Sequence, residues 1–107
     1  MRTLKFIIDN QIITTDPTCD FSGLVPGTEG YLQAEFSFSP EWDKCVKVAE
    51  FIGRSDKDCY PQILKDGKTC VIPAEAIKRP AFGIRVVGKN DERKLTTNKL
   101  IVCQKGD

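Results

Sequence analysis

Apolar and polar residues alternate along several short stretches of the chain, most regularly from Tyr31 to Phe38. Every second residue of this stretch is apolar or aromatic, namely Leu32, Ala34, Phe36 and Phe38. A period of two places alternate side chains on opposite faces of a β-strand. The stretch therefore predicts a strand with one buried face and one solvated face.

The longest strand–turn–strand pattern runs from Ala81 to Cys103. A polar segment from Gly88 to Arg93 separates its two apolar arms, which contain Ile84, Val86 and Val87 before the turn and Leu95, Leu100, Ile101 and Val102 after it. This pattern predicts a β-hairpin. Two long strands need partners to cover their apolar faces, so the other segments of the chain must supply them.

Two further hairpins are predicted from turn-forming residue pairs. Asp9-Asn10 separates the apolar stretches 4–8 and 11–15, and Asp66-Gly67 separates 59–64 from 68–72. Glycine at the second position supplies the positive φ of a type I′ turn, so the Asp66-Gly67 pair is the stronger signal. Residues 44–54 predict one more strand, and 16–30 predict a loop because prolines and glycines interrupt any period.

Two single-turn helices are predicted at corners. In the first, Ser39 suits an N-cap, Pro40 the first helical position and Glu41 the positive end of the helix dipole. This turn would place Trp42 over the core as a lid between two sheets, although an exposed tryptophan could instead stack on a ligand. Residues 73–77 predict the second turn, which Pro80 ends.

Together these elements predict one all-β domain over residues 1–107. About eight short strands, turns at corners and no long amphipathic helix favour an antiparallel, immunoglobulin-like β-sandwich, with a small β-barrel as the alternative. A chain of 107 residues is long enough to fold without a metal or a disulfide. The polar segment 104–107 is expected to fray.

The residue types argue against an enzyme. The chain contains no histidine, so the commonest general base and the Ser-His, Cys-His and His-metal combinations are absent. Its five cysteines are odd in number and none forms a C-x-x-C pair, which favours reduced thiols over a disulfide or a metal site. We therefore expect no cofactor and no catalytic residues. The five positions are Cys19, Cys45, Cys59, Cys70 and Cys103.

Charge is distributed unevenly along the chain. Residues 1–53 carry four basic and eight acidic side chains, whereas residues 54–107 carry twelve and seven. Aromatic residues are not interleaved with the basic ones, so a nucleic-acid partner is not favoured. No apolar run is long enough for a membrane helix, and we expect an unprocessed cytoplasmic chain. Arg85, Lys89, Arg93 and Lys94 could form a small anion-binding tip on the last hairpin, partly neutralised by Asp91 and Glu92.

Several segments resemble a known family in sequence and order. They are KFIIDNQII, YLQAEFSFSPEW with a downstream FIG, DGKTCVIPAEAI, FGIRVVG and LTTNKLIV, which together span Lys5 to Val102. The chain resembles the small N-terminal β-sandwich modules of tail and baseplate structural proteins from phages of Gram-positive bacteria. In those modules a strand ending near a tryptophan, a proline turn after a Cys-Val-Ile strand and a Thr-Thr-Asn segment before the last strand recur.

The resemblance implies a non-enzymatic virion module that assembles with copies of itself or with other phage tail proteins. A second hypothesis is a phage-encoded inhibitor that binds a host protein or sequesters a small charged ligand. A third is a carbohydrate-binding module that uses Trp42, Tyr31 and Tyr60. The expected location is the virion or the cytoplasm of the infected or lysogenic bacterial host.

Overall fold

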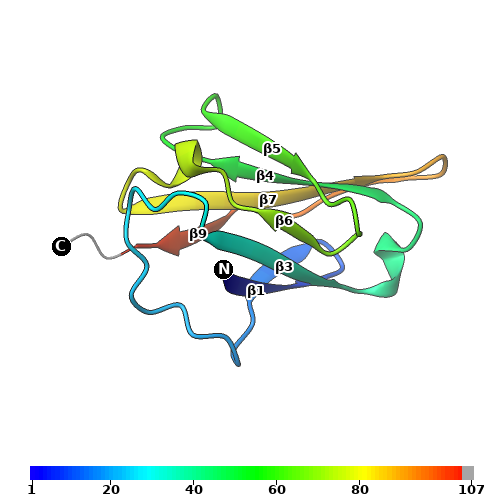
Figure 1. The fold of residues 1–107 in the computed structure, drawn as a ribbon. Coiled ribbons are helices and arrows are strands. Elements are labelled where there is room, and N and C mark those ends of the chain that lie inside the picture. The colour runs from blue at the N-terminus through cyan, green and yellow to red at the C-terminus, as the bar shows by residue number, and fades with distance from the viewer. Residues whose placement is uncertain (105–107) are drawn as a thin grey trace.

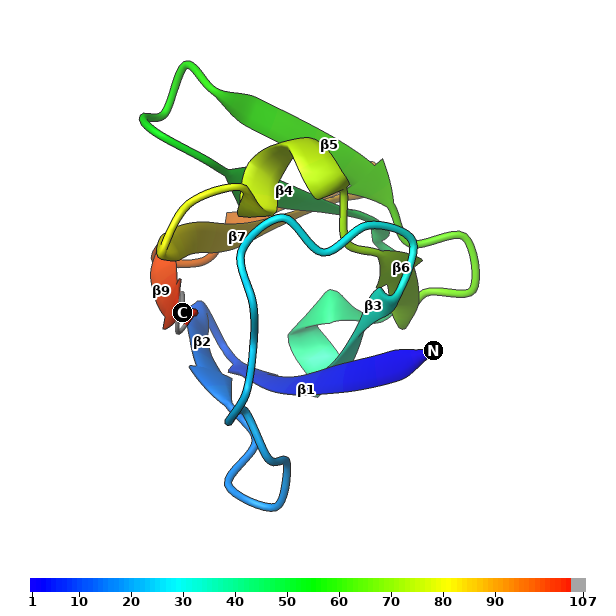
Figure 2. The same ribbon diagram turned by 60° about the vertical axis from the view of Figure 1, so that its left-hand side comes forward.

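Two β-sheets pack face to face in the computed structural model, which describes residues 1–104 (Figure 1). Figure 2 shows β1, β2 and β3 in one layer and β4, β5 and β7 in the other. The predicted all-β sandwich is confirmed. The segment expected to fray lies outside the described residues except for Gln104, where the expectation is wrong. Gln104 is only 4% exposed, and its side-chain amide donates hydrogen bonds to the carbonyl oxygens of Ile77 and Arg79.

Sheet A has the strand order β2-β1-β3-β6. Sheet B has the order β5-β4-β7-β8, and β9 pairs with the remaining length of β7. A 3₁₀ turn, η1 (Pro40–Trp42), connects β3 to β4, and another, η2 (Ala74–Ile77), connects β6 to β7. The strands are β1 (Arg2–Asp9), β2 (Ile12–Thr15), β3 (Leu32–Phe38), β4 (Val46–Ile52), β5 (Cys59–Ile63), β6 (Thr69–Val71), β7 (Ala81–Lys89), β8 (Lys94–Thr96) and β9 (Leu100–Cys103).

The first hairpin is present, but its turn is shifted by one residue. Asp9 pairs with Ile12, so Asn10 and Gln11 form the turn, and Asn10 has a φ of 56°. Ser39 does not cap η1 with its side chain. Its hydroxyl instead accepts the backbone N–H of Asn10 at 2.8 Å, so η1 holds this turn in place.

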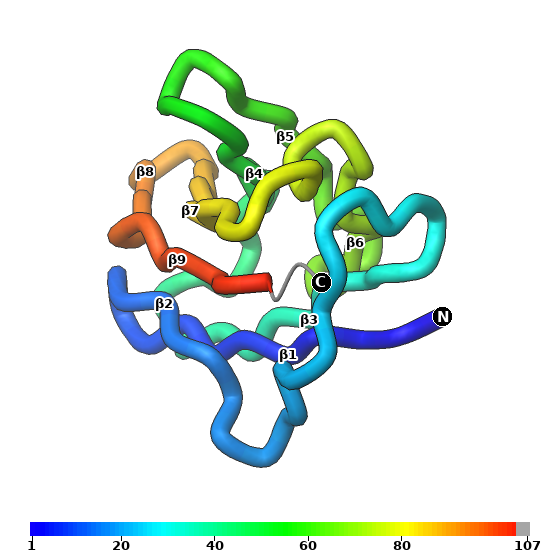
Figure 3. The backbone as a smooth tube through the Cα atoms, turned by 90° about the vertical axis from the view of Figure 1, so that its left-hand side faces the viewer, coloured from blue at the N-terminus to red at the C-terminus, as the bar shows by residue number. Residues whose placement is uncertain are grey.

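One strand pair is parallel, which the predicted antiparallel sandwich did not include. β3 runs alongside β1 in the same direction, with Arg2 opposite Leu32 and Ile8 opposite Phe38. β2 ends at Thr15, opposite the middle of β1, so the segment between β2 and β3 returns past the start of β1 and crosses it to reach Leu32. Figure 3 faces this end of the sandwich and shows the segment rising to η2 before β3.

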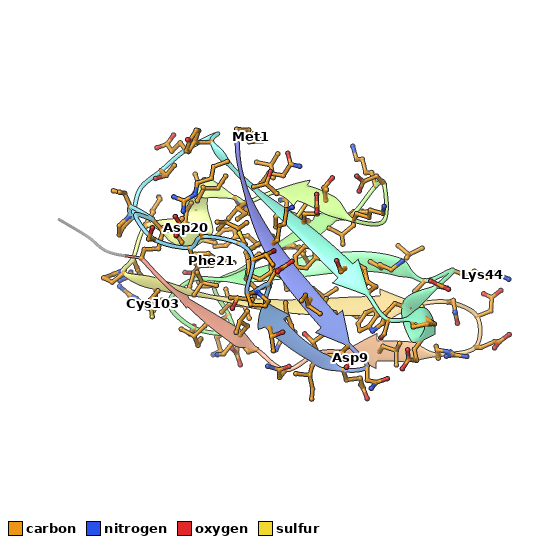
Figure 4. All side chains as sticks on the ribbon, turned by 90° about the horizontal axis from the view of Figure 1, so that it is seen from below. Met1, Asp9, Asp20, Phe21, Lys44 and Cys103 are labelled. Atoms are coloured by element: carbon orange, nitrogen blue, oxygen red, sulfur yellow. The ribbon has the colours of Figure 1, made fainter. Side chains whose placement is uncertain are left out.

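This crossing segment, residues 16–31, closes one end of the core. Leu24 is buried, and the ring of Phe21 packs edge-on against Phe6 at 5.5 Å. Figure 4 shows Phe21 on the loop beside β1. The predicted loop is therefore irregular in backbone but contributes apolar side chains to the core.

The prediction of a β-hairpin around Asp66-Gly67 is wrong. β5 pairs with β4 in sheet B, whereas β6 pairs with β3 in sheet A, so the chain changes sheets at this turn. Gly67 has the expected positive φ of 79°. The Asp66 carboxylate accepts hydrogen bonds from the backbone N–H groups of Lys68 and Thr69 and from the Thr69 hydroxyl, which directs the chain around a corner.

Asp66 at this corner is expected to make the stability of the fold depend on pH under acidic conditions. Hydrogen bonds from Thr69 and Lys68 lower the pKa of Asp66 from 3.8 to about 2. A carboxyl group with a lowered folded-state pKa stabilises the fold above its unfolded pKa, and this stabilisation is lost as pH falls. In thermal unfolding between about pH 4 and pH 2, we expect the stability difference between the wild type and Asp66→Asn to shrink. Asp91→Asn is the control, and a difference that stays constant with pH would contradict the assignment.

The final hairpin is confirmed, with a bulge in its second arm. Val87 pairs with Thr96 and Ile84 with Leu100, so two residues of β7 face three residues between these pairs. The bulge directs Asn98 toward sheet A. Its backbone N–H donates to the Gln11 carbonyl oxygen at 3.2 Å, and its Oδ1 accepts the N–H of Ile13 at 2.9 Å.

Candidate interaction surfaces

The four residues predicted to form a cationic tip do not all lie together in the structure. Arg85 lies on the outer face of sheet B and forms an ion pair with Glu50, at 2.8 Å from Nε to Oε1. Arg93 lies in the turn with its guanidinium 3.8 Å from the Glu92 carboxylate. Lys89 and Lys94 face each other where β7 and β8 leave the turn. The structure therefore brings only the two lysines and Arg93 to the tip, and two of the four predicted cations have acidic partners.

Trp42 is not available for surface contact, so its prediction as a contact residue is wrong. The side chain is 0% exposed, and Nε1 donates a hydrogen bond to the Asn10 carbonyl oxygen at 2.6 Å. Its ring lies 5.3 Å from that of Phe38 and contacts β7 at Gly88. The main interpretation of Trp42, a lid between the two sheets, agrees with this position, since the ring connects η1 to both layers.

The sugar-binding hypothesis loses its central residue for the same reason. Of its other two aromatic residues, Tyr31 is exposed before β3. Tyr60 is half-buried on β5 and donates its hydroxyl to the Asp58 carboxylate at 2.5 Å. Tyr31 precedes a strand of sheet A and Tyr60 lies on a strand of sheet B, so the predicted three-residue aromatic surface is not formed.

A band of exposed and half-buried aliphatic side chains lies on the outer face of sheet B, and we call it the outer apolar band. It consists of Val46 and Val48 on β4, Ile63 on β5 and Val87 on β7. Val48 lies directly opposite both Ile63 and Val87, so these three side chains share one face across three strands. Val46 is 65% exposed and Ile63 is 59% exposed.

The outer apolar band is hollowed and has a polar border. A depression of about 500 Å³ is lined by Val46, Val48 and Val87 together with Lys89, Asn90 and Asp91. The Glu50–Arg85 ion pair lies one step further along the same strands. An apolar centre with a polar rim is the usual composition of a protein-binding surface.

The sequence indicates that β4 is apolar on both faces, but it does not show which apolar residues face the core and which face outward. The segment predicted as a strand from 44 to 54 has apolar residues at both odd and even positions. Ala49 and Phe51 face the core, whereas Val46 and Val48 face outward. A strand with two apolar faces leaves one of them exposed unless other parts of the protein cover both. Here no segment within residues 1–104 covers the outer face.

An adjacent edge is protected against strand addition. The Leu64 N–H donates a hydrogen bond to the Lys47 carbonyl oxygen of β4. In an antiparallel pair, backbone N–H groups point alternately toward and away from the neighbouring strand. The nitrogen of Pro61, three residues earlier, therefore points away from β4. Proline has no N–H, so it removes one donor from the free edge of β5. Binding to sheet B is therefore favoured at its outer face over this edge.

The structure shows all five cysteines as free thiols. Burial raises the pKa of Cys70 to about 12, and burial with the nearby Glu50 charge raises the pKa of Cys59. These two thiols are therefore poor nucleophiles at neutral pH. Within the described part of the chain, no three histidine, cysteine, aspartate or glutamate residues are arranged to hold a metal ion.

Comparisons with protein-family models, with curated proteins and with solved structures find no match to this chain. Among residues 1–104, no helix has the length and apolar character needed to cross a membrane.

Proposed function

We propose that this chain is a non-enzymatic interaction module of a phage tail or baseplate, and that it binds a partner protein through the outer apolar band. The observation that carries the proposal is one sheet face on which Val46 and Ile63 are exposed and the adjoining Val48 and Val87 are half-buried. The sequence resemblance supports the phage context. The partner is a neighbouring tail protein or a second copy of the chain, in the virion or during its assembly in the host cytoplasm.

Covering this surface would favour association. Burying an exposed valine or isoleucine contributes on the order of 1–2 kcal/mol, because apolar surface is removed from water. The band contains two such residues, Val46 and Ile63, next to its two half-buried valines. All four already hold fixed positions in a sheet, so little side-chain ordering opposes binding. Lys89 and Asp91 on its border provide charges of both signs for the partner.

A charge placed in the centre of the band should prevent this binding. Val48→Lys would introduce an ammonium group between Ile63 and Val87, where a bound partner would desolvate it. We expect Val48→Lys to reduce binding at least tenfold, which corresponds to about 1.4 kcal/mol. The readouts are light scattering after size exclusion for self-association and capture of proteins from purified phage particles for tail partners.

Ile12→Lys is the matched control, because Ile12 is 60% exposed on a strand of the other sheet. It should bind like the wild type, and thermal unfolding should show that both variants are folded. A wild type that remains monomeric at high concentration and captures no virion protein would disprove the proposal. Equal losses in the two variants would disprove the location of the surface.

The phage-encoded inhibitor remains a second candidate, in the form that sequesters a small charged ligand. One observation favours it, namely a cleft at the other end of sheet B with two arginines that form no ion pair within residues 1–104. Such a protein would act in the host cytoplasm. A ligand-binding test of that cleft separates this candidate from the docking function.

A further inference from the structure

Two adjoining hollows lie where the β4–β5 loop meets the start of β7, at the end of the sandwich that faces the viewer in Figure 3. Their volumes are about 400 and 430 Å³, and they share Arg54, Ser55 and Arg79. We call the two hollows together the arginine cleft. Its combined size suits a small organic ligand better than a single inorganic ion.

The backbone on both sides of the arginine cleft is fixed. The Asp58 carboxylate accepts the N–H of Arg54 at 2.9 Å, and the Gly53 N–H donates to the Asp58 carbonyl oxygen at 2.8 Å. On the opposite side, the buried side chain of Gln104 donates to the Arg79 carbonyl oxygen at 2.8 Å. The two arginine side chains therefore extend from anchored backbone into solvent.

The charges in the cleft leave an excess of positive charge. Lys99 pairs with Asp56 at 3.1 Å, whereas Arg54 and Arg79 form no ion pair with any residue from 1 to 104. Lys57 and Asp58 line the second hollow with them, so three cations face one carboxylate there. The Tyr60 hydroxyl and the Arg54 N–H lower the pKa of Asp58, and the charges of Arg79 and Arg54 act in the same direction.

The remaining wall is apolar. Ile101 on β9 is 54% exposed, and Pro80 beside it is exposed as well. Gly83 on β7 and Ile52 on β4 are buried, and the methylene groups of Lys99 lie over Gly83, where a Cβ would come within 3.0 Å of them. A flat apolar group can therefore lie against Ile101, Pro80 and the Lys99 methylene groups while its charged end reaches the arginines.

We propose that the arginine cleft binds a phosphate monoester of an apolar or aromatic group. The planar guanidinium groups of Arg54 and Arg79 would bind the phosphate oxygens in pairs, which an ammonium group cannot do. The wall formed by Ile101, Pro80 and the Lys99 methylene groups would contact the organic part. This inference goes beyond the docking function and uses none of the residues of the outer apolar band.

The test is isothermal titration calorimetry with three probes: adenosine monophosphate, adenosine and inorganic phosphate. We expect adenosine monophosphate to bind more tightly than either fragment. Arg54→Ala and Arg79→Ala should each weaken its binding roughly tenfold, since each removes charged hydrogen bonds. Raising the salt concentration should also weaken it, because the arginines are exposed.

Arg93→Ala is the matched control, an exposed arginine in the β7–β8 turn that does not line the cleft, and it should bind like the wild type. Absence of binding by both adenosine monophosphate and inorganic phosphate would overturn the proposal. So would equal effects of Arg79→Ala and Arg93→Ala. Equal affinities for inorganic phosphate and adenosine monophosphate would overturn the role of the apolar wall.

The outcome is independent of the docking function. Val48→Lys should bind adenosine monophosphate like the wild type, and Arg79→Ala should retain partner binding. Loss of both activities in either variant would show that the two surfaces are not separate sites, and it would overturn the assignment of the phosphate ester to the cleft alone.

Discussion

Replacing Trp42 with alanine is expected to lower the free energy of unfolding by about 3–5 kcal/mol. The indole is fully buried, and its nitrogen donates a hydrogen bond to the carbonyl oxygen of Asn10 in the first hairpin turn. Truncation would leave a cavity between the two sheets and an unpaired carbonyl oxygen. Urea unfolding followed by circular dichroism measures the loss.

Trp42→Phe separates the two contributions. Phenylalanine retains most of the ring contact with Phe38 but cannot donate to Asn10, so a smaller loss of about 1–3 kcal/mol is expected. A loss below about 1 kcal/mol for Trp42→Ala would contradict the placement of the indole as the link between η1 and the two sheets.

Replacing Gly88 with alanine is expected to destabilise the protein by about 1–3 kcal/mol, although only a methyl group is added. A Cβ at this position would lie 2.6 and 2.7 Å from two carbons of the Trp42 ring. The ring is rigid and enclosed, so β7 or η1 would have to move. In a Trp42→Ala background the same substitution should cost much less, giving a coupling energy of about 1 kcal/mol or more.

Gly83→Ala provides the matched control on the same strand. Its Cβ would meet the flexible Lys99 side chain, which can move aside, in place of an aromatic ring. We therefore expect Gly83→Ala to be clearly less destabilising than Gly88→Ala. Equal losses, or no coupling between Gly88 and Trp42, would disprove the steric explanation.

Local sequence patterns predicted the positions of the strands better than they predicted which strands pair. The alternation in residues 31–38 and the two arms of the last hairpin gave strands at the correct places. Asp66-Gly67 gave a turn, but a turn signal describes four residues and does not distinguish a hairpin from a corner between sheets. The parallel pairing of β1 with β3 depends on contacts between distant segments, which no local period encodes.

The candidate surfaces were harder to predict because they depend on which face each side chain occupies. The charges of the last hairpin are adjacent in sequence, yet Arg85 is paired with Glu50, which is 35 residues away. The outer apolar band combines three strands, and the arginine cleft combines a loop, η2's exit and β7. Residues such as Arg54 and Arg79 carry no motif, so only the folded chain shows that they meet.

The contact between Asn98 and Ile13 also constrains how the chain folds. The hydrogen bond joins residues that are 85 positions apart, and it connects the last hairpin to the first. Closing so long a segment costs chain entropy before the contact forms, and proteins dominated by such distant pairings fold in milliseconds to seconds. We therefore expect the joining of sheet A to sheet B at this bulge to slow the folding of the chain.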